Sequence, residues 1–467
     1  MTSAANPELK GHRFHPTLLR EYDLRGRVGE TLHESDALAL GRAVGAMAMS
    51  EGRTRLAVGY DGRLSSPALE RALVEGLVRS GVVVTRLGLG PTPLLYFAIQ
   101  QLDLQGGVMV TGSHNPPDEN GFKIVLGPEP FHGARIAGLG ALAEAGRFVE
   151  GIGRVETVDL RGRYASALAG PLRDSRALSV AWDCGSGATG EIVAAMAKEL
   201  PGRHLLLNAE IDGRFPAHHP DPTVPRNLMQ LQEAVREHGF DIGIAFDGDG
   251  DRIGVVDAEG QILWADQLMI LLAESVLRER PGAPIVADVK ASQTLFDAIA
   301  AAGGRPILSP SGYTVIRSRM LAENAPLAGE MSGHIFFNDD WTGYDDALYV
   351  AIRTLKVLAR SGESLADFRA RLPKTFSTPE LRIPCPDERK AAVIASVADS
   401  ARAADAQIDE TDGIRVHEAS GWWLLRASNT QAVLAARCEA NSPDELKRLK
   451  ARLAALLERH GLELPPS

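Results

Sequence analysis

A short apolar run rich in β-branched residues, then a loop containing Asp or Gly, and then a helical pattern form the unit that recurs along this chain. Three such units pair a strand-like run with a helix-like run: residues 56–61 with 65–78, 179–183 with 191–200, and 285–288 with 292–302. A second β-prone run follows each helix, at residues 82–85, 204–207 and 306–308. Right-handed βαβ crossovers produce this order and build parallel sheets covered by helices. The wide spacing of the units predicts three related α/β domains rather than one continuous sheet.

The pattern changes after about Arg371. Runs at residues 413–416, 421–426 and 432–437 are typical of antiparallel strands, and residues 443–457 have the periodicity of an amphipathic helix. We interpret this last part of the chain as a separate α+β domain.

The length of the chain supports several domains, because 467 residues exceed the size at which a single hydrophobic core stops growing. We therefore predict an α/β protein with three similar mixed-sheet α/β domains and a smaller C-terminal α+β domain. The expected domains are residues 1–155, 156–256, 257–370 and 371–467.

The net charge argues against two classes of partner. Fifty basic and sixty acidic side chains leave a formal charge of −10, so neither nucleic acid nor an anionic membrane surface is an expected partner. The first 22 residues are polar and lack the apolar core of a signal peptide. No run of about 18 apolar residues occurs either. We therefore expect a cytoplasmic protein.

Residues 111–123, Thr-Gly-Ser-His-Asn-Pro-Pro-Asp-Glu-Asn-Gly-Phe-Lys, form the first loop that offers reactive groups. Ser113 follows the buried-strand pattern of residues 106–111, and sites in α/β proteins form at the carboxyl ends of strands. His114 and Lys123 are nearby groups for proton transfer or charge stabilisation. The alternative is a plain turn, since Ser, Asn, Pro and Gly are the usual turn residues.

Three common reactive motifs are missing from the sequence. Thr111 stands where the nucleophile elbow Gly-x-Ser-x-Gly requires its first glycine, which excludes a hydrolase of that kind. The phosphate-binding P-loop and the dinucleotide fingerprint do not occur, so no motif supports nucleotide-driven transfer.

A second loop concentrates three acids at one turn. Asp247, Asp249 and Asp251 alternate with glycines between two β-prone apolar runs. The glycines let the backbone curl until the carboxylates converge, and carboxylate oxygens suit a hard cation such as Mg²⁺. An EF-hand is excluded, because it needs Gly in place of Arg252 and Glu in place of Ala258. A solvated acidic turn is the remaining alternative.

The serine loop and the acidic loop together indicate phosphoryl transfer. A phosphorylated serine carries a charge of about −1.5 to −2, which a cation held by carboxylates can neutralise. Transfer through Ser113 is therefore the leading hypothesis.

A third loop has groups that suit a sugar. Residues 329–334 are expected to be extended, with Glu330, Ser332 and His334 on one side of the segment. Such a row can bind sugar hydroxyls. An exposed strand edge is the alternative.

A fourth loop has the chemistry of a phosphate site. It follows a strand-like run and contains Arg426, Ser428, Asn429 and Thr430. A fork-shaped guanidinium, two hydroxyls, an amide and the N–H groups of a turn all favour phosphate oxygens. Near the start of the chain, Tyr22 and Arg25 can add to the same site. Ordinary solvated turns are the alternative in both places.

With these motifs in place, the chain resembles the α-D-phosphohexomutase family, and most closely its bacterial phosphomannomutase/phosphoglucomutase branch. The motifs occur in the order of the family: Tyr22-Asp-x-Arg-Gly, Thr111-Gly-Ser-His-Asn-Pro, Asp247-Gly-Asp-Gly-Asp-Arg, Gly329-Glu-Met-Ser-Gly-His and Arg426-x-Ser-Asn-Thr. The resemblance spans the whole chain. It implies three similarly folded α/β domains and a smaller fourth domain around a central cleft.

The resemblance also implies roles for individual residues. Ser113 would be the phosphoserine, and one of its phosphoryl oxygens would bind one Mg²⁺ per chain together with Asp247, Asp249 and Asp251. Transfer would be assisted by His114, Lys123 and Arg252. The residues implied to contact the substrate are Tyr22, Arg25, Gly312, Tyr313, Glu330, Ser332, His334, Arg426, Ser428, Asn429 and Thr430.

The implied reaction starts with transfer of the phosphoryl group from Ser113 to a free hydroxyl of a hexose phosphate. Glucose 1,6-bisphosphate is the bound intermediate for the glucose substrate and also the expected activator. The intermediate then turns around and returns its other phosphate to Ser113. Mannose and glucose phosphates are the expected substrates.

Two residues depart from the family pattern in the segment Ser309-Pro-Ser-Gly-Tyr313. The family usually has Lys and His where this chain has Pro310 and Tyr313. One cation and one imidazole are therefore missing, and Arg317 or Arg319 is the candidate to compensate.

Three other functions stay open at this point. A phosphoglucosamine mutase shares the implied fold and chemistry. A sugar-phosphate sensor without turnover and a metal-dependent phosphatase are further alternatives. We expect a monomer, with a dimer as the alternative.

Overall fold

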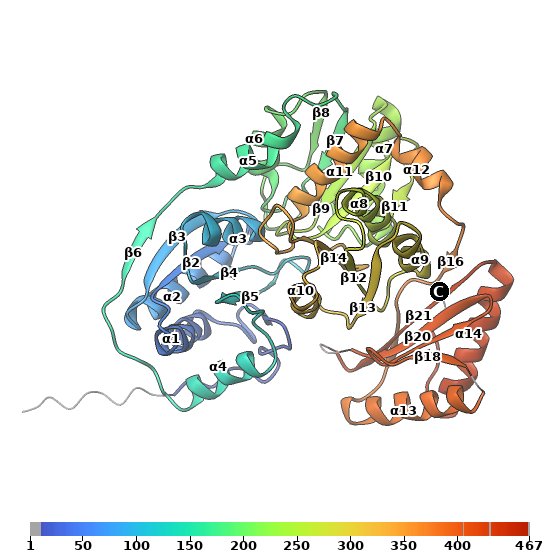
Figure 1. Ribbon diagram of the computed structural model, residues 1–467. Helices are drawn as coiled ribbons and strands as arrows, with labels where there is room; N and C mark the ends of the chain where they lie inside the picture. Colours follow the sequence, from blue (N-terminus) through green and yellow to red (C-terminus); the bar gives the residue numbers. More distant parts are fainter. Residues whose placement is uncertain (1–10, 405, 429–430, 466–467) are drawn as a thin grey trace, which may run out of the picture.

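The computed structural model describes residues 11–404, 406–428 and 431–465. Four sheets, each accompanied by helices, follow one another along the chain (Figure 1). Three of them mix parallel and antiparallel strands, and the fourth is antiparallel. The predicted fold class is therefore confirmed.

The first sheet has the strand order β1-β5-β4-β2-β3-β6. Its strands are β1 (Leu24–Arg27), β2 (Arg55–Tyr60), β3 (Val83–Leu89), β4 (Gly106–Val110), β5 (Glu119–Leu126) and β6 (Arg154–Thr157). The helices are α1 (Glu34–Ser50), α2 (Ser66–Arg79), α3 (Thr92–Gln101) and α4 (Ala134–Glu144). The side chains of one face of the sheet share a core with α1, α2 and α4. Those of the other face pack with α3 into a core that continues into the second and third sheets.

The second sheet has the order β11-β10-β9-β7-β8. Its strands are β7 (Val180–Asp183), β8 (His204–Leu207), β9 (Ile242–Phe246), β10 (Ile253–Asp257) and β11 (Ile262–Leu263). The helices are α5 (Arg161–Ala169), α6 (Gly190–Ala197) and α7 (Met229–His238), with short 3-10 turns η1 (Gly170–Leu172) and η2 (Pro225–Leu228). Strands β8, β7 and β9 are parallel, whereas β9 and β10 form an antiparallel hairpin.

The third sheet has the order β13-β12-β14-β15. Its strands are β12 (Pro284–Asp288), β13 (Arg305–Ser309), β14 (Leu327–Gly329) and β15 (Ile335–Phe337). The helices of this part of the chain are α8 (Ala265–Glu279), α9 (Gln293–Ala301), α10 (Tyr313–Ala322), α11 (Ala347–Ser361) and α12 (Leu365–Arg371).

The fourth sheet is the antiparallel one. Its strands are β16 (Phe376–Ser377), β17 (Leu381–Pro384), β18 (Gln407–Asp409), β19 (Ile414–Glu418), β20 (Gly421–Ala427) and β21 (Val433–Ala440). Two helices pack with it, α13 (Asp387–Ala403) and α14 (Pro443–Glu458). Helix α14 begins at the predicted Pro443, because the Ser442 side chain accepts a hydrogen bond from the N–H of Glu445 and caps it.

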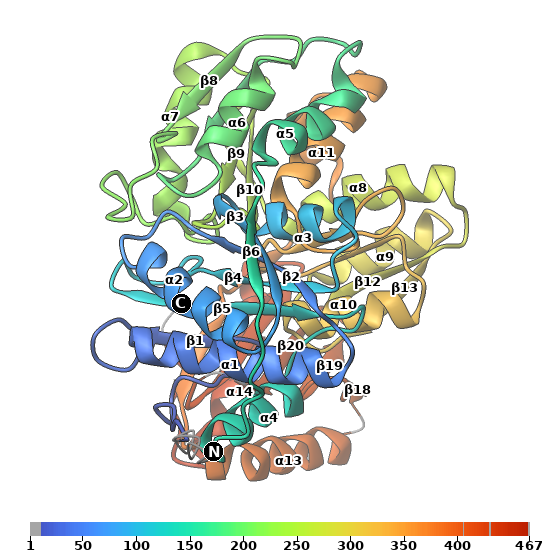
Figure 2. The same cartoon turned by 90° about the vertical axis from the view of Figure 1, so that its left-hand side faces the viewer.

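Two elements lie close to or across the expected domain limits. Strand β6 contains residue 155 and runs along the outside of the first sheet toward α5 (Figure 2). Helix α11 follows the third sheet in sequence and packs against α8 and β15 of that domain, but it also packs against α5, η1, β9 and β10 of the second. The exact limits of the domains stay a prediction, because the first three sheets share one core.

Within the described part of the chain, no helix combines the length and the apolar character needed to cross a membrane.

The shared core leads to a prediction about α11. Ile352 is 1% exposed in this core, so Ile352→Ala should lower the free energy of unfolding by about 2–5 kcal/mol through lost burial and a cavity. Ile152 is fully exposed, and Ile152→Ala should change it by less than about 0.5 kcal/mol. Urea unfolding followed by tryptophan fluorescence measures both. Equal midpoints for the two variants would contradict the packing of α11.

Candidate active site

Ser113 lies in the loop between β4 and β5 and faces the acidic loop of the second sheet. Its hydroxyl donates a hydrogen bond of 2.6 Å to Asp247 Oδ2, across 134 residues of sequence. His114 Nδ1 is 3.2 Å from the same hydroxyl. Since the one hydroxyl proton is given to Asp247, the imidazole must be the donor in this second contact. Ser113 is 2% exposed and has a φ of 49°, a left-handed conformation that is uncommon for residues other than glycine.

The acidic loop connects β9 and β10 and is folded around its own first carboxylate. Asp247 Oδ1 accepts the backbone N–H groups of Asp251 and Arg252, at 3.0 and 3.1 Å. Gly248 lies directly against the serine loop, because a Cβ there would be 2.4 Å from the carbonyl oxygen of Ser113. The two loops can therefore approach only with glycine at this position.

The three aspartates form a group that fits a divalent cation. One carboxylate oxygen from each of Asp247, Asp249 and Asp251 lies within 4.8 Å of the others, and all three residues are buried. Asp249 Oδ1 and Asp251 Oδ1 are buried without a hydrogen-bond donor. Such unpaired oxygens are costly unless a cation or a proton satisfies them. The donor set is one of hard oxygens, as Mg²⁺ or Mn²⁺ prefers.

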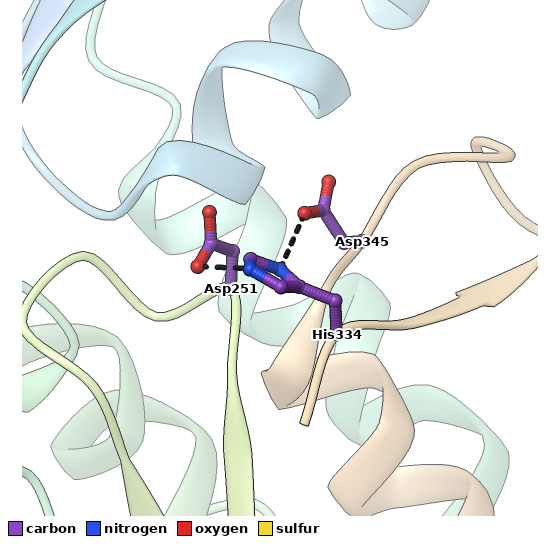
Figure 3. A group of neighbouring side chains, drawn as sticks. All are labelled: Asp251, His334 and Asp345. Carbon is purple, nitrogen blue, oxygen red and sulfur yellow. Dashed lines mark ion pairs between the residues drawn. The ribbon is translucent and has the colours of Figure 1, made fainter. Parts of the chain in front are cut away.

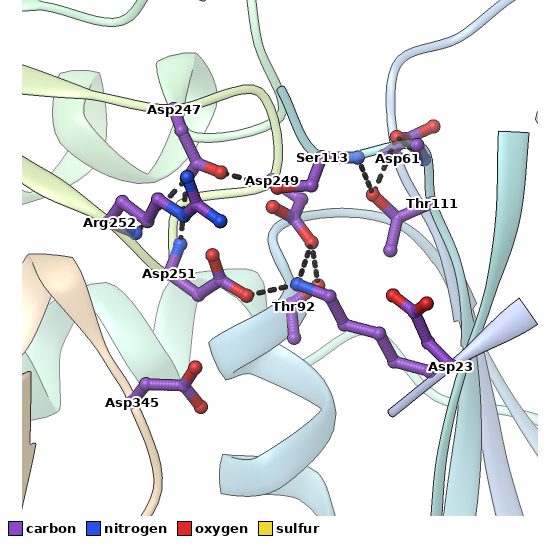
Figure 4. A network of polar contacts seen from close by, with 12 residues as sticks. Asp23, Asp61, Thr92, Thr111, Ser113, Asp247, Asp249, Asp251, Arg252 and Asp345 are labelled. Carbon is purple, nitrogen blue, oxygen red and sulfur yellow. Dashed lines mark hydrogen bonds and ion pairs between the residues drawn. The ribbon is translucent and has the colours of Figure 1, made fainter. Parts of the chain in front are cut away.

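Lys123 on β5 supplies positive charge to the three aspartates, which Figure 4 shows together with Ser113. Its ammonium is 2.7 Å from Asp249 Oδ2 and also pairs with Asp251. Burial lowers the pKa of Lys123, but the charges of Asp249 and Asp251 outweigh burial and raise that pKa overall. Lys123 is therefore held charged, which suits charge stabilisation and not the role of a base.

The carboxylates differ in their affinity for a proton. Burial and the charges of Asp251 and Asp249 raise the pKa of Asp247 well above its usual value. Burial also acts on Asp249, but the neighbouring Lys123 outweighs it and lowers the pKa of this carboxyl. Burial, with the positive charges of Arg252 and Arg25, lowers the pKa of His114. This imidazole is therefore neutral near pH 7.

Arg252 links the acidic loop to His334 of the third sheet. Its Nε donates to His334 Nε2 at 2.9 Å, so the other ring nitrogen, Nδ1, must carry the proton. His334 Nδ1 is 2.8 Å from Asp345 Oδ2 and 3.6 Å from Asp251 Oδ1 (Figure 3). Asp345 was not predicted as a site residue, because it follows no strand-and-loop pattern and belongs to no recognisable motif.

The segment with Glu330, Ser332 and His334 is a tight turn between β14 and β15, so the expectation of an extended strand is wrong. The Glu330 N–H donates to the His334 carbonyl at 2.8 Å, and Gly333 closes the turn with a φ of 94°. Strands β14 and β15, on either side of the turn, pair as an antiparallel hairpin. The expectation of one extended segment did not include this pairing. Glu330 accepts the Gly312 N–H at 2.6 Å and the Ser332 hydroxyl at 3.1 Å.

Tyr22 and Tyr313 join the first and third sheets. The Tyr313 hydroxyl donates to the Tyr22 carbonyl at 3.0 Å, and the Tyr22 hydroxyl donates to the Ser311 carbonyl at 3.1 Å. The Tyr313 ring also stacks on His334, with 5.6 Å between ring centroids. Arg25 contacts the serine loop, since its Nη1 donates to the Thr111 carbonyl at 2.9 Å.

The fourth domain approaches the third sheet through Asp412. This carboxylate accepts Arg426 Nε at 2.7 Å and the Ser311 N–H at 3.0 Å. Arg426 is therefore close to the loop of Tyr313. Ser428 follows on the same loop, and its N–H donates to the Val433 carbonyl at 3.1 Å. The predicted Asn429 and Thr430 lie outside the described residues.

Lys290, just after β12, is a cation that the sequence reasoning missed. Its ammonium is 3.6 Å from Asp288 and 3.5 Å from Glu380. Burial lowers its pKa, but the charges of Asp288 and Glu380 outweigh burial and raise it overall. A lysine directly after the Ile285–Asp288 run was the available signal, since strand ends carry the reactive groups of this fold.

The two arginines expected to compensate for Pro310 and Tyr313 are engaged elsewhere, so that expectation is wrong. Arg317 donates to the carbonyl oxygens of Gly343 and Pro128, at 3.0 and 3.1 Å. Arg319 pairs with Glu323 one turn along α10, at 2.9 Å.

Comparison with protein families gives one consistent match for each part of the chain. Models of the phosphoglucomutase/phosphomannomutase family match as follows: α/β/α domain I at residues 16–138, domain II at 163–260, domain III at 264–376 and the C-terminal domain at 380–456.

Individual proteins agree with the family match. The chain is 40% identical to a phosphomannomutase/phosphoglucomutase of Pseudomonas aeruginosa, over 100% of this chain and 99% of that protein. It is 40% identical to a phosphoglucomutase of Neisseria gonorrhoeae, over 94% and 96% of the two chains. A crystal structure of a phosphoglucomutase/phosphomannomutase family protein from Burkholderia thailandensis superimposes with a TM-score of 0.92 and 38% identity, covering 97% of this chain and 100% of that one. With four domain models in sequence and relatives matched over their full length, this chain belongs to the phosphoglucomutase/phosphomannomutase family.

Proposed function

We propose that the protein is an isomerase that interconverts hexose 1-phosphates and hexose 6-phosphates of glucose, mannose or both through a phosphorylated Ser113. The observation that carries the proposal is the 2.6 Å contact between the Ser113 hydroxyl and Asp247 of the buried acidic group. A buried hydroxyl beside a group of carboxylates that fits a divalent cation is suited to accepting and donating a phosphoryl group.

Mg²⁺ is the proposed metal, held by Asp247, Asp249, Asp251 and an oxygen of phosphorylated Ser113. When bound, it supplies positive charge to the phosphoryl group. The unpaired oxygens of Asp249 and Asp251 support this assignment. Lys123 and Arg252 add two further cations at the same place, and each is fixed by a hydrogen bond or an ion pair.

In the first half-reaction, a sugar hydroxyl attacks the phosphorus atom on Ser113. A new P–O bond to the sugar forms and the bond to Ser113 Oγ breaks. The sugar hydroxyl loses its proton, and the released serine oxygen takes up one proton to become a hydroxyl, so the net proton count is unchanged. The serine oxygen that is released is stabilised by the donor His114, 3.2 Å away in the unphosphorylated protein. Because phosphoryl transfer has a loose transition state, fixed positions and fixed charges supply most of the acceleration.

Substrate recognition is assigned to the third and fourth domains. Glu330 and Ser332 offer hydrogen bonds to sugar hydroxyls. The phosphate that is not reacting is assigned to Lys290 and to the loop of Arg426, Ser428, Asn429 and Thr430. A bisphosphate intermediate, glucose 1,6-bisphosphate in the case of glucose, turns around between the two half-reactions, so each phosphate visits both positions.

Choice of sugar is tested by direct comparison. Glucose 1-phosphate, mannose 1-phosphate and glucosamine 1-phosphate are assayed side by side with Mg²⁺ and a trace of the matching bisphosphate. We expect kcat/KM for glucose or mannose to exceed that for glucosamine. Faster turnover of the amino sugar would reverse the assignment, and steady release of inorganic phosphate would indicate a phosphatase.

The phosphoserine is tested by Ser113→Ala. We expect kcat to fall by about 10⁴-fold or more, because no other group of the loop can carry the phosphoryl group. Intact-mass analysis of the wild-type protein should show one added phosphate, absent from Ser113→Ala. The control is Ser361→Ala, an exposed serine at the end of α11. Near-normal turnover by Ser113→Ala would exclude Ser113 as the carrier.

The metal ligands are tested by Asp249→Asn. The affinity for Mn²⁺, followed by the electron paramagnetic resonance signal of free Mn²⁺, should fall by at least about tenfold, because an amide is a weaker ligand than a carboxylate. Asp340→Asn, at an exposed acid, should bind like the wild-type protein. Unchanged Mn²⁺ binding by Asp249→Asn would remove this residue from the ligand set.

A further inference from the structure

We propose that Arg63 and Phe215 form a clamp between the first and second domains, and that this clamp holds the Ser113 loop in its strained position against the acidic loop. Both are positioning residues for the phosphoryl transfer, and the proposal rests on the proposed function. Neither residue belongs to the loops that carry the reactive groups.

Arg63 lies between β2 and α2 and is 1% exposed. Its guanidinium donates to four backbone carbonyl oxygens of the serine loop: Ser113 at 2.8 Å, Asn115 at 2.6 Å, Glu119 at 2.8 Å, and Pro116. Only arginine has a planar fork with enough N–H groups for this arrangement. A lysine at this position retains the charge but cannot reach four carbonyl oxygens from one point.

Asp61 fixes the other end of the same loop. Its carboxylate accepts the Thr111 hydroxyl at 2.8 Å and the Gly112 N–H at 3.1 Å. The Thr111 hydroxyl oxygen in turn accepts the Ser113 N–H at 2.8 Å (Figure 4). Arg63 packs flat on this backbone, since a Cβ on Gly112 would be 2.3 Å from the guanidinium. Buried side chains therefore fix the serine loop at both of its ends.

The conformation of Ser113 explains why so many contacts are needed. Its φ of 49° lies in the left-handed region. A residue other than glycine is strained in this region, and the conformation persists where the surrounding structure fixes it. Without the contacts from Arg63, the loop can relax and move the hydroxyl away from Asp247.

Phe215 belongs to the second domain and covers Arg63 from outside the loop. Its ring centroid is 5.2 Å from the guanidinium carbon, and the side chain is buried. Phe215 is itself strained, with a φ of 51°. The two backbones touch here, because a Cβ on Gly213 would be 2.6 Å from the Gly62 carbonyl oxygen. The second domain thus holds Arg63 in place as well as carrying the acidic loop.

The serine loop is therefore enclosed by the second domain on two sides. Gly248 of the acidic loop contacts the carbonyl of Ser113 directly. Phe215 acts on the same carbonyl through Arg63, which donates to it. In the described residues, the guanidinium hydrogen-bonds only to loop carbonyl oxygens and pairs with Asp61, at 3.2 Å. It has no contact with the aspartates at 247, 249 and 251, so its action is through position.

The test compares Arg63→Lys, Phe215→Leu and Phe215→Tyr with the wild-type protein in the glucose 1-phosphate assay. We expect Arg63→Lys to lower kcat by about 100-fold, with KM changed less than about threefold, because a displacement of about 1 Å has an effect of that size. Phe215→Leu should lower kcat by about tenfold. Phe215→Tyr retains the ring over the guanidinium and should restore kcat to within about twofold of the wild-type value. Arg71→Lys, at an exposed arginine of α2, is the matched control.

The outcomes separate this proposal from the proposed function. Wild-type kcat in folded Arg63→Lys, as judged by an unchanged thermal midpoint, overturns the clamp and leaves the function intact. If Arg63→Lys does not fold, the two Phe215 variants decide, and equal kcat for Leu and Tyr overturns the clamp. No interconversion by the wild-type protein overturns both proposals. A fall in kcat with KM preserved and rescue by tyrosine supports the clamp, since a general loss of folding would not depend on the ring.

Discussion

Three buried carboxylates at one turn set the main physical constraint on this structure. Asp247, Asp249 and Asp251 are inaccessible to water, so their mutual repulsion must be offset by positive charge nearby. Lys123 supplies that charge to Asp249 and Asp251. The pKa of Asp247 is instead raised, by burial and by the charges of the other two aspartates. Because Lys123 belongs to the first domain, the acidic loop of the second domain is satisfied only when the two domains are packed together.

That dependence accounts for the construction of the interface. The first three sheets share one apolar core, so their relative positions are fixed by packing as well as by the ion pairs. Gly248 allows the acidic loop to touch the serine loop, and Arg63 holds the serine loop through its backbone carbonyl oxygens. The fourth domain meets the third through polar contacts such as Asp412 with Ser311 and through a small apolar cluster of Val289, Leu308, Trp422 and Leu424. A small, partly polar interface of this kind allows relative motion of the domains more readily than a large shared core does.

The sequence predicts those parts of the fold and the site that a local pattern of residues marks. The strand at 204–207 and the start of the last helix at Pro443 are predicted at their observed limits. A short apolar run marks the strand, and periodicity with a cap marks the helix. The turn at 330–334 is not predicted, because hairpin pairing depends on a partner strand. Asp345 reaches the site through tertiary packing, and no local pattern marks it. Lys290 directly follows a strand, which is a local signal, but its pairing with Glu380 depends on tertiary packing. Arg63 belongs to an ordinary-looking strand-to-helix loop, and only its carbonyl partners reveal its function as a clamp.

The replacement of an imidazole by Tyr313 changes the electrostatics of the third domain in a definite way. Burial raises the pKa of its hydroxyl, so the side chain is neutral and acts as a hydrogen-bond donor to the Tyr22 carbonyl. The ring stacks on His334 and lies 5.8 Å from the Lys123 ammonium, which places it among the reactive groups as a rigid apolar wall. In the proposed reaction, Lys290 and Arg426 supply the positive charge for the phosphate that does not react. Asp412 already pairs with Arg426, and Asp288 with Lys290. An incoming phosphate therefore competes with these two carboxylates for the two cations. Phosphate binding is thus coupled to the contact between the third and fourth domains.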